Sequence, residues 1–102
     1  MPDDDPVARK VFRAFVRDGR ITAMPARWSK KLVLLDHVVR LFEPGMCYPE
    51  PIVNRRLRWV HDDYVALRRY LVDAGLLSRE SGVYWRSGGS VDGWLGEGKE
   101  DS

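Results

Sequence analysis

The chain has 102 residues, of which 44% are hydrophobic and 31% charged, and this balance is typical of one globular domain rather than of a disordered chain. The longest apolar run covers residues 32–35, far fewer than the roughly 20 residues of a bilayer span. No signal region opens the chain, so we expect a cytoplasmic protein that is not in a membrane. The single cysteine, Cys47, leaves no internal disulfide and too little sulfur for a structural zinc site.

The net charge of +2 is distributed unevenly along the chain. Residues 1–8 and residues 87–102 each carry −3, so residues 9–86 carry +8. A positive body attracts polyanions because their binding releases condensed counterions, and nucleic acid is therefore the first partner class to consider. The same excess is also compatible with ordinary solvated surface charge.

The composition divides the chain into three parts. We predict an acidic arm at residues 1–6, a folded domain at residues 7–86 and a tail at residues 87–102, with the sequence SGGSVDGWLGEGKEDS. Both ends are expected to be flexible, because neither has a hydrophobic period that would bury a face.

The first predicted helix begins at Pro6, with Asp5 as its cap. One side carries an apolar stripe at helical spacing, formed by Ala8, Val11, Phe12 and Phe15. The opposite side carries a cationic group, formed by Arg9, Lys10, Arg13 and Arg17. A phosphate-bearing partner or the acidic ends of the chain would supply the counter-charge. Asp18-Gly19 then predicts a turn, and residues 21–24 a short extended segment.

Two further helices are predicted in the middle of the chain. The second covers residues 29–42 and is expected to be the most buried, with apolar positions at Leu32, Leu34, Leu35, Val38, Val39, Leu41 and Phe42. Glu43-Pro44-Gly45 ends this helix. The third begins in the Pro49-Glu50-Pro51 segment, where proline suits a first helical turn, and its inner face is formed by Val53, Leu57 and Val60.

The fourth helix is predicted for residues 62–74. Asp62 is its expected N-cap, because its side chain can accept a hydrogen bond from the Val65 amide. Gly75 occupies the position of a left-handed residue just after the helix end.

A β-hairpin is predicted next, with strands at residues 77–79 and 83–86 around a turn at residues 80–82. The expected fold class is therefore mainly α with a small β-hairpin. Four helices plus a two-stranded wing, in this order, are typical of a winged helix-turn-helix domain. In such a domain the fourth helix is the recognition helix, which enters the DNA major groove.

The predicted DNA-binding residues are basic side chains from three helices and the hairpin: Lys30, Lys31, Arg55, Arg56, Arg68, Arg69, Arg79 and Arg86. Arg69 would read a guanine edge, Arg68 would hold a phosphate, and the hairpin arginines would contact the DNA backbone. Asp62 and Asp63 oppose this interpretation, because two carboxylates beside phosphates are repulsive. Aspartates at a helix start are also explained by capping and the helix dipole alone.

Several segments together resemble a bacterial family called domain of unknown function 2087. The matching pieces are Asp18-Gly19-Arg20, Met24-Pro25, Lys30-Lys31, Phe42-Glu43-Pro44-Gly45, Tyr48-Pro49-Glu50 with Val53-Asn54, His61-Asp62-Asp63-Tyr64, LRRYLVD at residues 67–73, Gly75-Leu76-Leu77 and Tyr84-Trp85-Arg86. The resemblance implies a helix-turn-helix-like fold, found alone or joined to a DNA-binding domain in transcriptional regulators, and no biochemical activity. Pro49 and Pro51 depart from the family's usual pattern.

Three classes of function follow from these observations. We expect a non-enzymatic DNA-binding transcriptional regulator, with double-stranded DNA as its partner and with no cofactor or metal. The alternative is a protein-interaction or sensory module of a regulatory system, with a protein partner or a homodimer. An enzyme or metal site would have to use His61 with Asp62 and Asp63, whose side chains diverge at a helix start.

The remaining reactive and aromatic side chains are expected to be structural. Cys47 is predicted to be a small buried hydrophobe, and the core and its rim are predicted to contain Trp28, Trp59, Tyr84 and Trp85.

Overall fold

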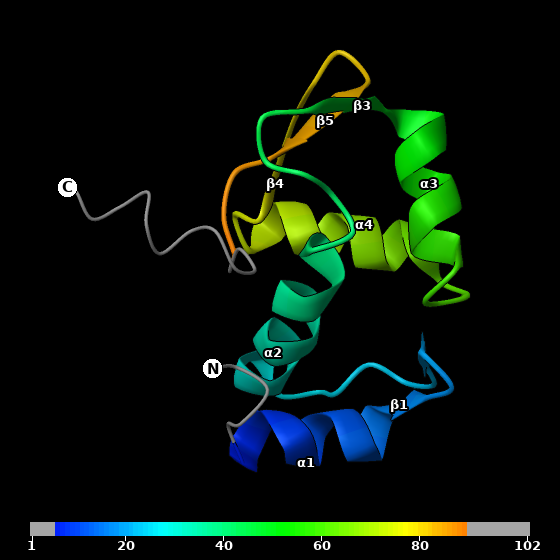
Figure 1. Cartoon of the computed structure of the whole chain (residues 1–102), viewed down its shortest axis with the longest axis vertical. Helices are drawn as coiled ribbons and strands as arrows, with labels where there is room; N and C mark the ends of the chain where they lie inside the picture. Colours follow the sequence, from blue (N-terminus) through cyan, green and yellow to red (C-terminus); the bar gives the residue numbers. More distant parts are fainter. Residues whose placement is uncertain (1–5, 90–102) are drawn as a thin grey trace, which may run out of the picture.

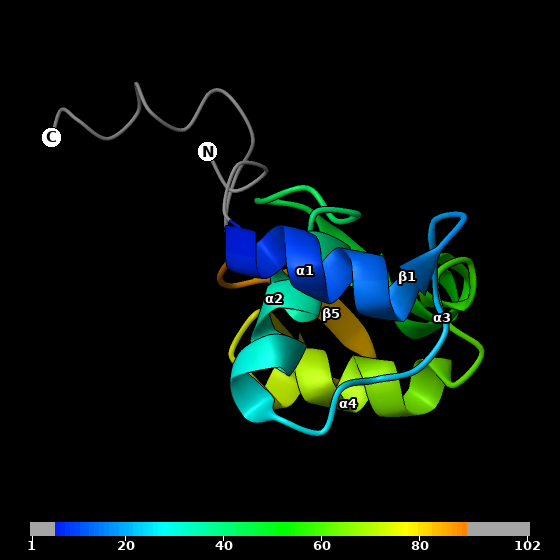
Figure 2. The same ribbon diagram turned by 90° about the horizontal axis from the view of Figure 1, so that it is seen from below.

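A computed structural model describes residues 6–89. Within them the chain forms four helices: α1 (Pro6–Phe15), α2 (Trp28–Val39), α3 (Glu50–Arg58) and α4 (Tyr64–Asp73). Two small antiparallel sheets complete the α/β domain, and α2 lies between α1 and α4 (Figure 1, Figure 2). The predictions for Asp5, for the arm up to residue 5 and for the tail from residue 90 lie outside the described residues.

The predicted hairpin forms, and a third strand joins it. β4 (Leu77–Glu80) and β5 (Val83–Arg86) pair around a tight turn in which Ser81 and Gly82 have positive φ angles of 54° and 80°, the conformation that a two-residue hairpin favours. β3 (Cys47–Pro49) pairs antiparallel with the other edge of β5, so the strand order is β3-β5-β4. The sequence analysis did not predict β3, because three residues that end in proline have no alternating pattern.

A second, very short hairpin follows α1. β1 (Val16–Arg17) pairs with β2 (Arg20–Ile21) around the predicted Asp18-Gly19 turn. Only the first residue of the expected extended segment belongs to a strand, because the pairing with β1 ends there. The Ile21 amide donates instead to the Val60 carbonyl, at 2.6 Å, and so ties this hairpin to the segment between α3 and α4.

The start of α3 agrees with the boundary predicted from the sequence, whereas the end of α2 differs from its predicted boundary. α3 begins at Glu50, with Pro51 in its first turn, as the proline pattern predicted. α2 ends at Val39 rather than at residue 42. The amides of residues 40–42 bond to carbonyls three residues back, so a tighter 3₁₀-type turn replaces the last part of the predicted α-helix.

The start of α4 also corrects a prediction. Asp62 does not cap this helix, which begins two residues later than expected. Asp63 is the N-cap, and its carboxylate accepts the Ala66 amide at 3.2 Å. Both aspartates satisfy the local rule for a cap, but Asp62 pairs with Arg20 from the β1–β2 hairpin.

The core lies among α2, α3, α4 and the three-stranded sheet. Its largest fully buried side chains are Leu34, Leu35, Val39, Phe42, Val53, Leu57, Leu67, Leu71, Leu77 and Tyr84. Each such apolar side chain contributes about 1.5–3 kcal/mol when it leaves water, so the apolar stripes of these helices account for most of the packing. α1 adds Val11 to this cluster from the far side of α2.

Four side chains that the sequence analysis placed in the interior are exposed. Trp28 and Leu32 are 44% and 37% exposed, and they lie one turn apart on α2, on the side away from the core. Trp59 is 64% exposed because it sits at the C-cap of α3, where the chain turns. Cys47 is exposed rather than buried. No helix within residues 6–89 has the length and apolar character that crossing a membrane requires.

Candidate nucleic-acid interface

The outer face of α4 carries Val65, Arg69 and Asp73 at intervals of four residues, so the three side chains lie on one side of the helix. All three are exposed. Arg69 and Asp73 have the spacing of a helical ion pair, but no ion pair joins them in the described part of the chain. Gly75 follows the helix end with a φ of 76°, which confirms the predicted left-handed position.

A cleft of about 190 Å³ lies between α4 and the β4–β5 hairpin. Its lining residues are Val65, Arg68, Arg69, Val72, Asp73, Arg79 and Tyr84. Figure 1 shows α4 running across the molecule beneath the three-stranded sheet. Three of the eight predicted DNA-binding residues therefore meet at one place: two come from α4 and one from β4.

A hydrogen-bonded network forms the floor of this cleft. The buried Tyr84 donates its hydroxyl to Glu50 Oε1 at 3.2 Å and accepts from Arg79 Nη1 at 3.3 Å. This contact with Tyr84 raises the pKa of Arg79 above its ordinary value. The second Glu50 oxygen lies 3.5 Å from Arg68 Nη1. Glu50 thus connects α3 to both α4 and the hairpin.

Arg68 is turned toward the protein, and only 16% of its side chain is exposed. Its Nη1 also donates to Asn54 Oδ1 on α3, and its guanidinium lies 6.0 Å over the Tyr84 ring. A partly buried charge is costly unless it is paired and hydrogen-bonded. These partners therefore fix Arg68 in the wall of the cleft, whereas the sequence analysis expected it to hold a DNA phosphate.

The eight predicted DNA-binding residues divide into two groups of four. The exposed group consists of Lys30, Arg55, Arg69 and Arg79. The partly buried group consists of Lys31, Arg56, Arg68 and Arg86. Apart from Arg68, the members of this second group donate to backbone carbonyls: Lys31 to Ala26 at 3.2 Å, Arg56 to Leu41 at 2.7 Å and Arg86 to Phe42 at 3.3 Å. The structure therefore brings Arg69 and Arg79 to one exposed cleft and leaves Arg56 and Arg86 bonded to the interior.

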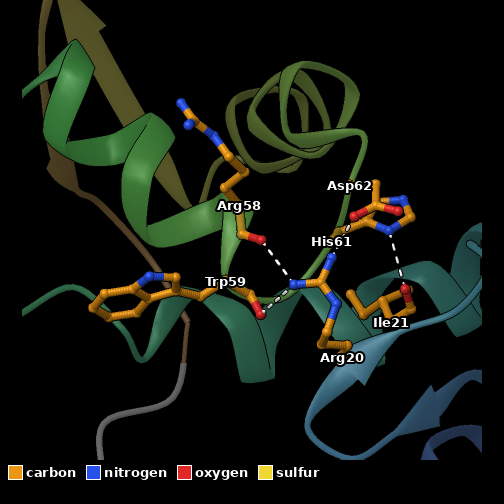
Figure 3. Close-up of polar contacts among 6 residues, drawn as sticks. All are labelled: Arg20, Ile21, Arg58, Trp59, His61 and Asp62. Atoms are coloured by element: carbon orange, nitrogen blue, oxygen red, sulfur yellow. Dashed lines mark hydrogen bonds and ion pairs between the residues drawn. The ribbon is translucent and has the colours of Figure 1, made fainter.

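Arg20 holds the connection between α3 and α4 in place (Figure 3). Its Nη1 donates to the carbonyls of Arg58 and Trp59, both at 2.9 Å, and its Nη2 donates to Asp62. The last carbonyls of a helix have no partner within the helix, so one guanidinium caps α3 and at the same time neutralises the carboxylate that precedes α4. We call this set of contacts the Arg20 bracket.

The family model that matches the chain covers residues 20–86 and carries the description "uncharacterized protein conserved in bacteria (DUF2087)". The chain belongs to this family. No curated protein and no solved structure matches the chain. The DUF2087 segment starts at Arg20 and ends at Arg86, so it contains the Arg20 bracket, the cleft and all eight predicted DNA-binding residues, and it leaves α1 outside.

Three consecutive polar residues of this DUF2087 domain, at positions 61–63, have structural partners. His61 Nδ1 donates to the Ile21 carbonyl at 3.1 Å (Figure 3), Asp62 pairs with Arg20, and Asp63 caps α4. No group of three or more His, Cys, Asp or Glu side chains within residues 6–89 is placed to hold a metal ion. These contacts account for the three side chains without a ligand.

Sequence reasoning gave no part in the site to Arg20, Glu50 or Tyr84, which hold it together, although it did predict Tyr84 in the core or at its rim. Their side-chain hydrogen bonds and ion pairs join residues that are 18 to 42 positions apart, except for the contact of Tyr84 with Arg79, so no local spacing connects them. All three residues occur in the pieces that carry the family resemblance, and that resemblance was the one signal that pointed to them.

Proposed function

We propose that this chain is a winged helix-turn-helix domain that binds double-stranded DNA and serves as a non-enzymatic transcriptional regulator. The order of the elements along the chain supports this proposal, because α2, β3, α3, α4 and the β4–β5 hairpin follow one another as is typical of that architecture. In this arrangement α4 is the recognition helix and β4–β5 is the wing.

One observation carries the proposal: Arg69 and Arg79 are exposed on the two sides of a single cleft, and no carboxylate pairs with either of them in the described residues. An arginine on the outer face of a recognition helix has the donors to bind a guanine edge in bidentate fashion. An arginine on the wing suits a backbone phosphate, which fixes the position of the protein on the duplex.

The acidic residues near α4 repel DNA phosphates less strongly than their number suggests. Asp62 is neutralised by Arg20, and Asp63 is engaged with the first turn of α4, where the helix dipole favours a negative charge. Asp73 is the carboxylate that remains on the outer face, at the opposite end of the helix. The N-terminal half of α4 is therefore the half that suits DNA.

The test is the affinity for a random-sequence duplex, measured by fluorescence anisotropy over a salt series. The affinity should fall with a log-log slope of about 0.9 per phosphate contact, and Arg79→Gln should reduce that slope by about one. Arg13→Gln is the matched control, because it removes the same charge from an exposed position on α1, across α2 from α4 (Figure 2). Absence of binding at about 50 mM salt, or an equal effect of Arg13→Gln, would contradict the proposal.

A second candidate function is a protein-interaction or sensory module that does not bind DNA. Val65 on the outer face of α4 is 45% exposed, and Trp59, near the start of the same helix in the chain, is 64% exposed. Exposed apolar side chains of this size occur at protein interfaces. This function predicts no duplex binding at low salt and a complex, with a protein or with a second copy, that Val65→Asp disrupts.

A further inference from the structure

Three guanidinium groups line one small cleft. Arg68 and Arg69 come from α4, Arg79 comes from β4, and Val65 and Val72 form apolar parts of the wall. Guanidinium groups repel one another at close range unless an anion lies between them or beside them. The cleft therefore concentrates positive charge in a concave site with partly apolar walls.

Each of the three arginines keeps N–H groups for a ligand. Arg69 has no side-chain partner within residues 6–89. Arg79 uses Nη1 for the Tyr84 hydroxyl, and Arg68 uses Nη1 for both Asn54 and Glu50. A guanidinium has five N–H donors, and Nη2 and Nε of Arg68 and Arg79 donate to no group within residues 6–89.

Two carboxylates and one hydroxyl face these arginines. Glu50 lies under the cleft, with one oxygen accepting from Tyr84 and the other near Arg68. Asp73 lies on the rim. The Tyr84 hydroxyl already donates to Glu50 and accepts from Arg79, so it has no proton left for a ligand. Three cations against two carboxylates leave one positive charge in the site.

The placement of the arginines on separate elements favours a phosphate over a carboxylate. A carboxylate has two oxygens in one plane and suits one guanidinium in bidentate fashion. A phosphate group has three or four acceptor oxygens in a tetrahedron, so it can accept from donors that approach from separate elements. Arg69 on a helix and Arg79 on a strand line the same cleft from two separate elements.

We propose that this cleft is a receptor for a single phosphate group, held by Arg69 and Arg79 and supported by Arg68. The phosphate belongs either to a DNA backbone, in which case the inference rests on the proposed function, or to a small phosphate ester, in which case it does not. Glu50 positions Arg68 and Tyr84 beneath the phosphate and limits the affinity through its own charge.

The experiment uses inorganic phosphate as the probe, exchanged against chloride at constant ionic strength. The arginine Nε–H signals of the full chain are followed by NMR during the titration. Saturable shifts of Arg69 and Arg79 are expected, with binding about tenfold weaker in Arg69→Gln and in Arg79→Gln, which is the loss of one charge-assisted hydrogen bond. Arg13→Gln should bind phosphate as the unchanged chain does.

Folding is controlled separately, because Arg79 also contacts Tyr84. Arg69→Gln removes no hydrogen bond or ion pair with a described residue, so its loss of binding reports on the cleft rather than on folding. Arg79→Lys keeps the charge but loses the fork of donors, and it should bind phosphate more weakly than the unchanged chain at an unaltered melting temperature. Absence of saturable shifts, or shifts that Arg69→Gln leaves unchanged, overturns the proposal.

Two further probes identify the source of the phosphate and separate this proposal from the proposed function. Binding of dimethyl phosphate and of a duplex, both weakened by Arg69→Gln, assigns the cleft to a DNA backbone. Binding of methyl phosphate without binding of a duplex supports the cleft and contradicts DNA binding. Binding of a duplex that is unaffected by Arg69→Gln and by competing phosphate supports DNA binding and overturns the cleft.

Discussion

Replacing Arg20 by glutamine is expected to destabilise the domain by about 2 kcal/mol. The substitution removes two hydrogen bonds to the carbonyls of Arg58 and Trp59 and the ion pair with Asp62. A hydrogen bond from a charged donor contributes about 1.5–3 kcal/mol when it is sheltered from water. The Arg20 side chain is 43% exposed, so we assign each of the two bonds about half of that range, and the two together give about 2 kcal/mol.

The ion pair itself should contribute little. The Asp62 side chain is 97% exposed, and an ion pair with such a partner contributes about 0–1 kcal/mol. Asp62→Asn should therefore cost less than about 0.5 kcal/mol. Most of the stabilisation is assigned to the capping of the α3 carbonyls, which a neutral residue at position 62 leaves intact.

Thermal unfolding followed by circular dichroism measures the difference. Arg20→Gln should lower Tm by about 10 °C, since about 1 kcal/mol corresponds to about 4–8 °C in a domain of this size. Arg17→Gln is the control, because Arg17 is the exposed cross-strand partner of Arg20 and should cost less than about 0.5 kcal/mol. The reasoning is refuted if Asp62→Asn costs as much as Arg20→Gln, or if Arg20→Gln behaves like Arg17→Gln.

Two other substitutions have effects that follow from single contacts. Glu50→Gln should lower the free energy of unfolding by about 1 kcal/mol, because Arg68 loses its charged partner, and should tighten phosphate binding, because a competing carboxylate is gone. Urea denaturation measures the loss of stability and the phosphate titration measures the gain in affinity; a weaker affinity would contradict the assigned role of Glu50. Gly75→Ala should cost about 1 kcal/mol because of the φ of 76° alone, since an added Cβ meets no atom within 4 Å, and Gly75→Asn should cost less. If thermal unfolding ranks the two variants in the reverse order, the positive φ is not the source of the cost.

Much of the fold followed from local patterns. The apolar spacing of α3 and α4 indicated the side that is buried, since Val53, Leu57, Leu67 and Leu71 are all in the core. The turn residues marked both hairpins, because Gly19 and Gly82 adopt the positive φ that such turns require. These features depend on residues close together in the chain, which is why the sequence sufficed for them.

The features that the sequence did not reveal depend on distant partners. β3 is three residues long and exists because it pairs with β5, about 36 residues later in the register of Tyr48 with Tyr84. Asp62 and Asp63 are equally suitable caps, and the contact of Asp62 with Arg20, 42 residues away, decides between them. Arg68 and Arg69 are adjacent in the chain but differ in exposure. Glu50 and Asn54 on α3 bind Arg68, whereas no described side chain forms a hydrogen bond or ion pair with Arg69.

The most direct test of the proposed interface is an amide NMR titration of the full chain with a short duplex at about 50 mM salt. DNA binding through α4 and the β4–β5 hairpin predicts that the largest shifts occur between residues 64 and 82, around Arg69 and Arg79, while the amides of α1 stay in place. Shifts centred on the cationic side of α1, or no shifts at all, would contradict it.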